Sequence, residues 1–320
     1  MTRYIIRRLL MFIPIVLGVS IIVQVLIDIA PGDPARMLAG LDPEPGQYEL
    51  IREQLRLDDP IYVRYGLFLS NAMKGNLGTS FYTKRPVFQD IIARWPYTVI
   101  LAALSVLFST LIGIPLGIFA ATHQYKVGDS AAVLASLITV SMPSFWFALL
   151  LVQFFAVRMG ILPVSGIADW KGWVLPIISL SLGYTAFITR QMRSDILEIV
   201  RQDFITTARS KGLSERKVLY KHALKNALIP VVQIIGGLFG FALGGALVAE
   251  MIFSLPGLGM YTLTGIQNRD YPAIQGSVMF LSLVFCTVIL LIDIAFAFID
   301  PRIRAQFVRR RKRTPNKEEA

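Results

Sequence analysis

Long apolar runs separated by short polar stretches dominate the pattern along the chain. A bilayer span needs roughly 20 apolar residues, and six windows meet or approach that length without a lysine or arginine. These windows cover residues 9–30, 97–121, 131–157, 174–189, 227–249 and 277–299. The fourth window is the shortest, and its ends are the least defined. The pattern predicts an all-α integral membrane protein with six transmembrane helices.

Composition agrees with a membrane location. Of the 320 residues, 54% are hydrophobic and 17% are charged, and the mean hydropathy is +0.59. A soluble domain usually carries about 25% charged residues, so an ordinary water-soluble core is excluded. The one cysteine, Cys286, excludes an internal disulfide. The first apolar run is too long for a signal peptide and no A-x-A cleavage site follows it, which predicts an uncleaved first span.

The positions of the basic residues explain the formal net charge of +11. With a cytoplasmic N-terminus, about two-thirds of the lysines and arginines fall on the inner segments, which are residues 1–8, 122–130, 190–226 and 300–320. An excess of basic residues on cytoplasmic segments is what orients membrane proteins. We therefore expect both termini to be cytoplasmic. The charge does not indicate a nucleic-acid partner.

This topology divides the chain into three parts. Residues 1–96 hold the first transmembrane helix and a large extracytoplasmic stretch, the outer segment (residues 31–96). Residues 97–299 form a five-helix core that contains the polar, positively charged stretch 190–226, the basic segment. Residues 300–320 are a basic cytoplasmic tail.

The outer segment is bounded by turn signals at Pro31–Pro34 and at Trp95–Pro96. Inside it, apolar residues recur at helical spacing; they are Ile61, Tyr65, Phe68, Leu69 and Met73. Such a stripe suits a small cap that packs on the outer ends of the spans. It equally suits a docking surface for an external partner, and the two interpretations are compatible.

Small residues recur every four positions in two of the spans. They are Gly113 and Gly117 in the second span and Gly236, Gly240 and Gly244 in the fifth. This spacing lets helices approach closely, so we expect tight helix packing there, with pore lining as the alternative. Prolines also fall in or near spans and predict kinked or broken helices; they are Pro14, Pro115, Pro143, Pro176 and Pro230.

The basic segment is predicted to form two short helices joined at a glycine. Gly212 follows a helical stretch and suits a left-handed cap. Ser214 is a good N-cap, and Glu215 suits the first turn of the next helix. An apolar ridge with a basic flank is expected on that helix, formed by Val218, Leu219 and Ala223. Two short helices of this kind fit a groove on a soluble partner. The alternative is a solvated basic loop whose charge only orients the protein in the membrane.

Motifs for catalysis or metal binding are missing from the sequence. It has no G-x-x-x-x-G-K-[ST] P-loop, H-E-x-x-H, G-x-S-x-G or C-x-x-C, and His123 and His222 lie far apart. We therefore expect no ATPase site, no catalytic residue and no metal site in this chain. Asp293 is the acid that lies deepest in a predicted span. It serves either a proton relay or a structural pairing with an arginine.

The basic segment resembles the EAA loop of ABC-importer permeases. The residues at the motif positions are Thr206, Thr207 and Ala208 for Glu-Ala-Ala, Gly212 for the glycine, His222 for the isoleucine, Leu224 for the leucine and Lys225 for the proline. The likeness is closer to the dipeptide/oligopeptide branch, which reads like T-A-R-A-K-G-L-S-E followed by H-A-L-R-N-A-L-I-P. Other stretches agree with this branch, namely Ala30–Ala35, Gly75–Ser80, Glu250–Gly259 and Arg269–Pro272.

The resemblance covers nearly the whole chain and implies a function. It implies a permease subunit with a type I ABC-importer transmembrane domain, embedded in the lipid of a bacterial cytoplasmic membrane. Such a subunit translocates small peptides (dipeptides or oligopeptides) in an ATP-driven importer. Import of glutathione or nickel chelates by the same machinery is the alternative. An ion-coupled secondary carrier and a membrane-embedded enzyme are more remote alternatives.

The resemblance also implies partners and site residues. The partners are a second homologous permease subunit, two cytoplasmic ABC ATPases that bind ATP and Mg²⁺, and an extracytoplasmic substrate-binding protein. This chain itself would bind no cofactor. The implied ATPase-coupling residues are Thr206, Thr207, Ala208, Gly212, Leu213, Ser214, Glu215, Val218, Leu219, His222 and Leu224. A translocation path or outer gate would include Glu250, Phe253, Pro256, Gly257 and Gly259.

Overall fold

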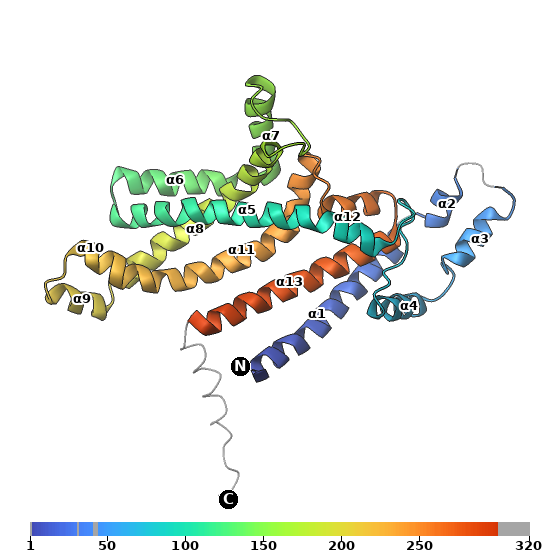
Figure 1. Ribbon diagram of the computed structural model, residues 1–320, viewed down its shortest axis with the longest axis horizontal. Coiled ribbons are helices and arrows are strands. Elements are labelled where there is room, and N and C mark those ends of the chain that lie inside the picture. Colours follow the sequence, from blue (N-terminus) through green and yellow to red (C-terminus); the bar gives the residue numbers. More distant parts are fainter. Residues whose placement is uncertain (1, 31, 41–43, 300–320) are drawn as a thin grey trace, which may run out of the picture.

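The computed structural model describes residues 2–30, 32–40 and 44–299, and this part of the chain is almost entirely helical (Figure 1). Five of its helices are each long and apolar enough to cross a membrane. They are α1 (Thr2–Ile29), α5 (Val87–Thr122), α8 (Lys171–Ile199), α11 (Leu224–Ile252) and α13 (Tyr271–Ile299). The predicted all-α membrane architecture is confirmed for the described residues.

The third predicted span is broken instead of continuous. α6 (Val127–Ser141) is followed by α7 (Ser144–Leu151) and the π-helical η1 (Val152–Arg158), and the two halves meet at an angle of 102°. Pro143 causes the break, because a proline disfavours helical backbone in the residue before it. Met142 is accordingly extended, with φ −88° and ψ 130°. There is a sixth span only if this bent pair counts as one.

The turn predicted at Trp95–Pro96 is wrong, because α5 already begins at Val87 and runs through it. Pro96 removes one backbone hydrogen bond, but packing holds the helix at this point. Trp95 lies edge-on against Phe280 of α13, with ring centroids 5.3 Å apart. α8 is also longer than the window that predicted it, so the basic segment starts inside this helix.

Close helix packing occurs at the spaced glycines. A side chain on Gly113 or Gly117 of α5 would overlap α8; at Gly117 its Cβ would lie 2.7 Å from the Thr189 carbonyl oxygen. On α11, Gly236 and Gly240 lie equally close to side chains of α13. The packing interpretation is therefore confirmed for both glycines of α5 and for two of the three on α11. Around the third, the described residues place no atom within 4 Å of a Cβ.

Substituting Gly117 tests this packing. In Gly117→Ala the added methyl group would lie 2.6 Å from Met192 Cβ, so we expect overpacking to cost about 1–3 kcal/mol. The thermal unfolding midpoint in detergent should fall accordingly. Gly18→Ala in α1 is the matched control, because no atom lies within 4 Å of its added methyl group. Equal midpoints for the two variants would contradict close packing at Gly117.

The two ends of the bundle carry different elements (Figure 1). At one end, the α12 end, lie α2 (Pro34–Ala39), α3 (Gln47–Gln54), α4 (Ile61–Met73) and α12 (Leu258–Gln267). At the other, the α9 end, lie α9 (Asp203–Ser210), α10 (Glu215–Lys217) and the turn between α5 and α6. α5 and α11 run between these two ends (Figure 1).

In the outer segment, α4 forms a cap on α1. The Tyr65 hydroxyl lies 2.8 Å from Ser20 Oγ, and Arg64 donates to Asp28 at 2.5 Å. Most of the predicted apolar stripe is half-buried, but Met73 remains 76% exposed. The cap interpretation is confirmed by these contacts, and the docking interpretation stays a prediction.

Candidate functional site

The joint predicted at Gly212 is present in the basic segment. Its φ of +74° lies in the left-handed region that suits glycine. The Gly212 amide donates to the Arg209 carbonyl at 2.9 Å, and the Leu213 amide donates to the Ala208 carbonyl at 3.4 Å. This pair of bonds is a Schellman motif, which closes the C-terminus of α9 and turns the chain toward α10.

The second helix of the basic segment is longer than predicted. Ser214 has the extended backbone of an N-cap (φ −61°, ψ 145°), although its side chain makes no capping bond. α10 then continues through the π-helical η2 (Val218–Ala223) directly into α11. Residues Glu215–Ile252 form one helical rod.

The apolar ridge on this helix faces inward, which corrects its predicted role as a contact for a partner. Val218 and Ala223, with 1% and 0% of their surface exposed, are buried with Ile205 and Ala208 of α9. Leu219 is half-buried against the same cluster. Burying apolar surface is already favourable within the chain. The ridge thus fastens η2 to α9 and leaves other side chains for a partner.

A basic, concave surface faces outward instead. This basic hollow has a volume of about 610 Å³ and is lined by Ser214, Arg216, Lys217, Tyr220 and Lys221. Glu215 does not neutralise it, because both of its carboxylate oxygens accept hydrogen bonds from Arg209, at 2.7 and 3.2 Å. Charge complementarity favours a negatively charged partner for such a surface.

The other predicted coupling residues differ in exposure. Thr206 and Thr207 are exposed on α9, whereas Ala208 is buried. His222 and Leu224 are half-buried on the rod. The structure thus gathers the predicted residues into one element at the α9 end. Contact with an ATPase stays a prediction for all of them.

At the α12 end, Glu250 connects three helices. Its carboxylate is fully buried and accepts hydrogen bonds from Thr98 Oγ1 at 2.6 Å and from the Met260 amide at 2.8 Å. The Thr98 hydroxyl in turn accepts one from the Leu258 amide at 2.8 Å. The first amides of a helix lack partners within it, and Glu250 and Thr98 supply them for α12. These four residues, the Glu250 joint, hold α5, α11 and α12 together.

Two glycines make room for the Glu250 joint. A Cβ on Gly257 would lie 2.1 Å from Glu250 Cδ, and one on Gly259 would lie 2.8 Å from the backbone of α11. Phe253 is buried nearby, whereas Pro256 is exposed. The structure therefore brings the five predicted gate residues together, most of them in packed protein. Their part in a translocation path stays a prediction.

Asp270 forms a second buried junction, which sequence reasoning missed. It is 1% exposed and accepts hydrogen bonds from Ser80 Oγ at 2.5 Å and from the Tyr82 amide at 3.1 Å. These bonds tie the outer segment to the start of α13. The two stretches Gly75–Ser80 and Arg269–Pro272, which the resemblance marks separately, thus meet in space. The available signal was an aspartate directly before a helix, a common capping position.

The remaining residues with possible chemistry do not gather into a site. Asp293 is half-buried in α13, and its relay or pairing role stays a prediction. His123 follows α5, whereas His222 belongs to η2. Among the residues that the structure describes, no three His, Cys, Asp or Glu side chains are placed to hold a metal ion.

The fold defines a multi-pass, all-helical membrane protein. Residues 113–305 match the family described as the binding-protein-dependent transport system inner membrane component. Residues 1–102 match the family of the N-terminal part of such membrane components. The chain belongs to this family of binding-protein-dependent inner-membrane permeases.

Individual relatives agree with this family. The chain is 38% identical over 304 residues to the glutathione transport system permease protein GsiC of Escherichia coli K12, which covers 95% of this chain and 99% of that protein. GsiC of Salmonella choleraesuis is 37% identical over the same length, with the same coverage. The chain is thus an ABC-importer permease of the peptide type, and a multi-pass inner-membrane protein.

Solved structures show the same fold at low identity. An inward-facing form of the MetNI methionine ABC transporter has a TM-score of 0.55 at 17% identity, covering 66% of this chain and 97% of that chain. An amino acid ABC transporter crystallised with histidines has a TM-score of 0.50 at 15% identity, covering 67% and 94%. The type I importer fold expected from the sequence agrees with these likenesses.

Removing the Glu250 side chain should destabilise the protein. Glu250→Ala leaves the Thr98 hydroxyl and the Met260 amide without their acceptor, and a buried unsatisfied polar group costs about 1–3 kcal/mol. Its thermal midpoint should therefore fall further than that of Glu250→Gln, which keeps one acceptor oxygen. If the Glu250→Ala midpoint equals that of the unmodified protein, the joint does not hold the three helices.

Proposed function

We propose that this chain is one of two related permease subunits that surround a path for small peptides and are driven by two cytoplasmic ATPases. One observation carries the proposal. The exposed basic element, jointed at Gly212, contains the N-terminal end, or foot, of a continuous helical rod that ends at the Glu250 joint. A push on that foot reaches the opposite end of the bundle. Basic segments favour the cytoplasm, so the α9 end and both termini are assigned to that side.

The rod is long enough to act across a bilayer. It has 38 residues, and at 1.5 Å per residue it extends for about 57 Å. The hydrocarbon core is only about 30 Å thick. Arg216 and Lys217, at the start of the rod, therefore lie beyond the lipid, within reach of a soluble protein. This supports a cytoplasmic ATPase as the occupant of the basic hollow.

The chemistry of that contact follows from the exposed side chains. Thr206 and Thr207 offer hydroxyl groups on α9, and the basic hollow offers cations on the rod. We infer that the receiving cleft of the ATPase is polar and acidic. ATP and Mg²⁺ are bound by the ATPases in this proposal, and this chain contributes movement of its helices.

Peptides are the substrate class that the relatives support. The relatives at 38% identity are glutathione transport permeases, and glutathione is itself a tripeptide. Glutathione is therefore a candidate substrate beside dipeptides and oligopeptides. A binding protein would deliver the substrate at the α12 end, where Tyr62 and Met73 of the outer segment are 73% and 76% exposed. These two side chains are the proposed contact for it.

Substituting Gly212 tests the coupling role. Proline fixes φ near −65°, so it cannot adopt the φ of +74° found here, and it lacks the amide that donates to Arg209. In the complete complex in liposomes, Gly212→Pro should still hydrolyse ATP but should lose uptake of labelled dialanine or glutathione. Normal uptake by this variant would refute the coupling role.

The matched control is Gly212→Asn. Asparagine tolerates the left-handed region better than most residues, and no atom lies within 4 Å of a Cβ at this position. This variant should therefore take up both labelled substrates at a near-normal rate. If Gly212→Asn is as defective as Gly212→Pro, the loss reflects the removal of glycine itself and not a distorted joint.

The remote carrier alternative depends on Asp293. In an ATP-driven importer, Asp293→Asn should retain most of the uptake because no proton has to bind during transport. Its rate should be measured across a pH series at constant ATP, beside the unmodified chain, and the two profiles should coincide. A lost or shifted pH profile would favour proton coupling over the proposed function.

A further inference from the structure

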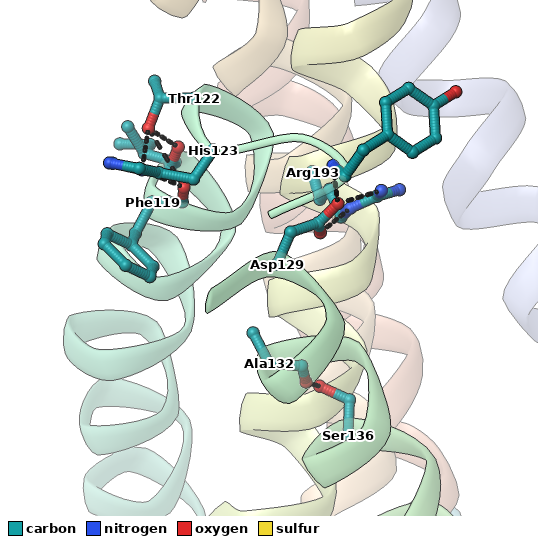
Figure 2. Close-up of polar contacts among 9 residues, drawn as sticks. Phe119, Thr122, His123, Asp129, Ala132, Ser136 and Arg193 are labelled. Atoms are coloured by element: carbon teal, nitrogen blue, oxygen red, sulfur yellow. Dashed lines mark hydrogen bonds and ion pairs between the residues drawn. The ribbon is translucent and has the colours of Figure 1, made fainter. Parts of the chain in front are cut away.

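A partly buried ion pair at the α9 end joins α6 to α8 (Figure 2). Arg193 Nε donates to Asp129 Oδ1 at 2.5 Å, and Arg193 Nη2 donates to Asp129 Oδ2 at 2.7 Å. The Tyr125 amide also donates to Asp129 Oδ2, at 3.0 Å. Asp129 is 3% exposed, whereas the Arg193 side chain is 25% exposed, so the pair is partly shielded from water. Two parallel bonds to one carboxylate constrain both the distance and the rotation between the helices.

The side chains of His123 and Ser136 form hydrogen bonds elsewhere. His123 Nδ1 lies 3.1 Å from Thr122 Oγ1 and 3.0 Å from the Phe119 carbonyl oxygen, and the imidazole ring lies away from Asp129 (Figure 2). Ser136, which is buried on α6, donates to a carbonyl of its own helix at 2.8 Å. The start of α6 is thus held to α8 through Asp129.

Arg193 lies where α8 enters the basic segment. Its neighbours Met192 and Ile196 are buried in a cluster that includes residues of α11. Ile199, at the end of α8, packs on the cluster that fastens α9 to η2. The foot of α8, the foot of the rod, and α9 therefore form one packed body around the Gly212 joint.

The bent pair α6–α7 leads from this body toward the α12 end. Ala148 and Leu151 of α7 are buried in one cluster with Ala249 and Phe253, which flank Glu250 in sequence or lie close to it. α6 and α7 meet at an angle of 102°. Packed contacts thus run from the basic segment through Arg193, α6 and α7 to the Glu250 joint. This route also contacts the rod at its far end, through Ala249 of α11.

We propose that Asp129 and Arg193 are positioning residues that carry movement of the basic segment into the bent α6–α7 pair. This inference rests on the proposed coupling role of that segment. When the segment moves, the ion pair makes α6 follow the foot of α8. The angle between α6 and α7 at Pro143 then changes, whereas the contact between α6 and α8 stays fixed. Arginine suits this role because its planar fork binds a carboxylate with two bonds, which lysine cannot reproduce.

We call this coupling of α6 to α8 by the Asp129–Arg193 pair the lock. Distances between spin labels test it directly. In a Cys286→Ser background, Leu134→Cys on α6 and Ser210→Cys on α9 place labels at exposed positions. In the complete complex in lipid nanodiscs, we expect one α6–α9 distance distribution, the same in the nucleotide-free and the ATP–vanadate-trapped states. Asp129→Asn and Arg193→Lys should each broaden it or make it differ between the states.

Two outcomes of that measurement overturn the proposal. One is a distance that changes between the states while Asp129 and Arg193 are both in place. The other is a pair of variants whose distributions match those of the parent chain. If Asp129→Asn fails to assemble, Arg193→Lys still decides the question, because it keeps the opposite charges and removes only the two-bond geometry.

Uptake per ATP hydrolysed gives an independent readout. With labelled glutathione or dialanine, Asp129→Asn should lower this ratio by about fivefold or more, the low end of typical coupling effects. The exchange of Asp129→Arg with Arg193→Asp should restore part of it. Asp58→Asn is the matched control, because it breaks the exposed Asp58–Arg52 pair at the α12 end, outside α4, and should leave the ratio unchanged. A normal ratio in Asp129→Asn would contradict the lock.

The same assays separate the two proposals. Normal uptake by Gly212→Pro would refute the coupling role of the basic segment as a whole. Loss of uptake in Gly212→Pro together with an unchanged ratio in Asp129→Asn would refute the lock alone. A lower thermal midpoint in Asp129→Asn without a change in ratio would assign the ion pair to stability only, and would also refute the lock.

Discussion

A carboxylate buried in apolar surroundings must find hydrogen-bond donors inside the protein, because burial without partners is costly. Three such acids hold this chain together where its helices meet. Glu250 and Asp270 lie at the α12 end and Asp129 at the α9 end, with 0%, 1% and 3% of their surface exposed. Close packing and interhelical hydrogen bonds position helices in lipid, because there is no hydrophobic driving force between them. The hydrogen bonds that each acid accepts therefore add to the glycine packing in placing the helices.

Between these junctions the long helices are continuous, even where they contain a proline such as Pro115 or Pro230. Backbone groups in lipid have to be satisfied within the helices, and Gly117 brings α5 into direct contact with α8. The backbone departs from helical geometry at the Gly212 joint and at the bend before Pro143. Such an arrangement suits a subunit that is moved by a partner. It agrees with membership in a family of binding-protein-dependent permeases.

The basic segment differs from a simple amphipathic docking element, in which an apolar face enters a groove. Its apolar ridge is already used to bind α9 to the rod, and the surface left for a partner carries hydroxyl groups and cations. Val218 therefore stabilises the element, whereas Arg216 and Lys221 lie on its exposed face. Internal packing and the exposed basic side chains are thus on opposite faces of one short stretch.

The sequence by itself determined the membrane architecture and the position of the Gly212 joint. Both rest on local requirements: the apolar length of a span and a left-handed backbone that suits glycine. It also indicated that Val218 belongs to an apolar face, but not that α9 covers that face. The break at Pro143, the Asp129–Arg193 pair and the contact of Ser80 with Asp270 across 190 residues appeared only in the tertiary structure. Periodicity and propensity act within a few helical turns, whereas the partner of a buried group depends on which distant helices pack together.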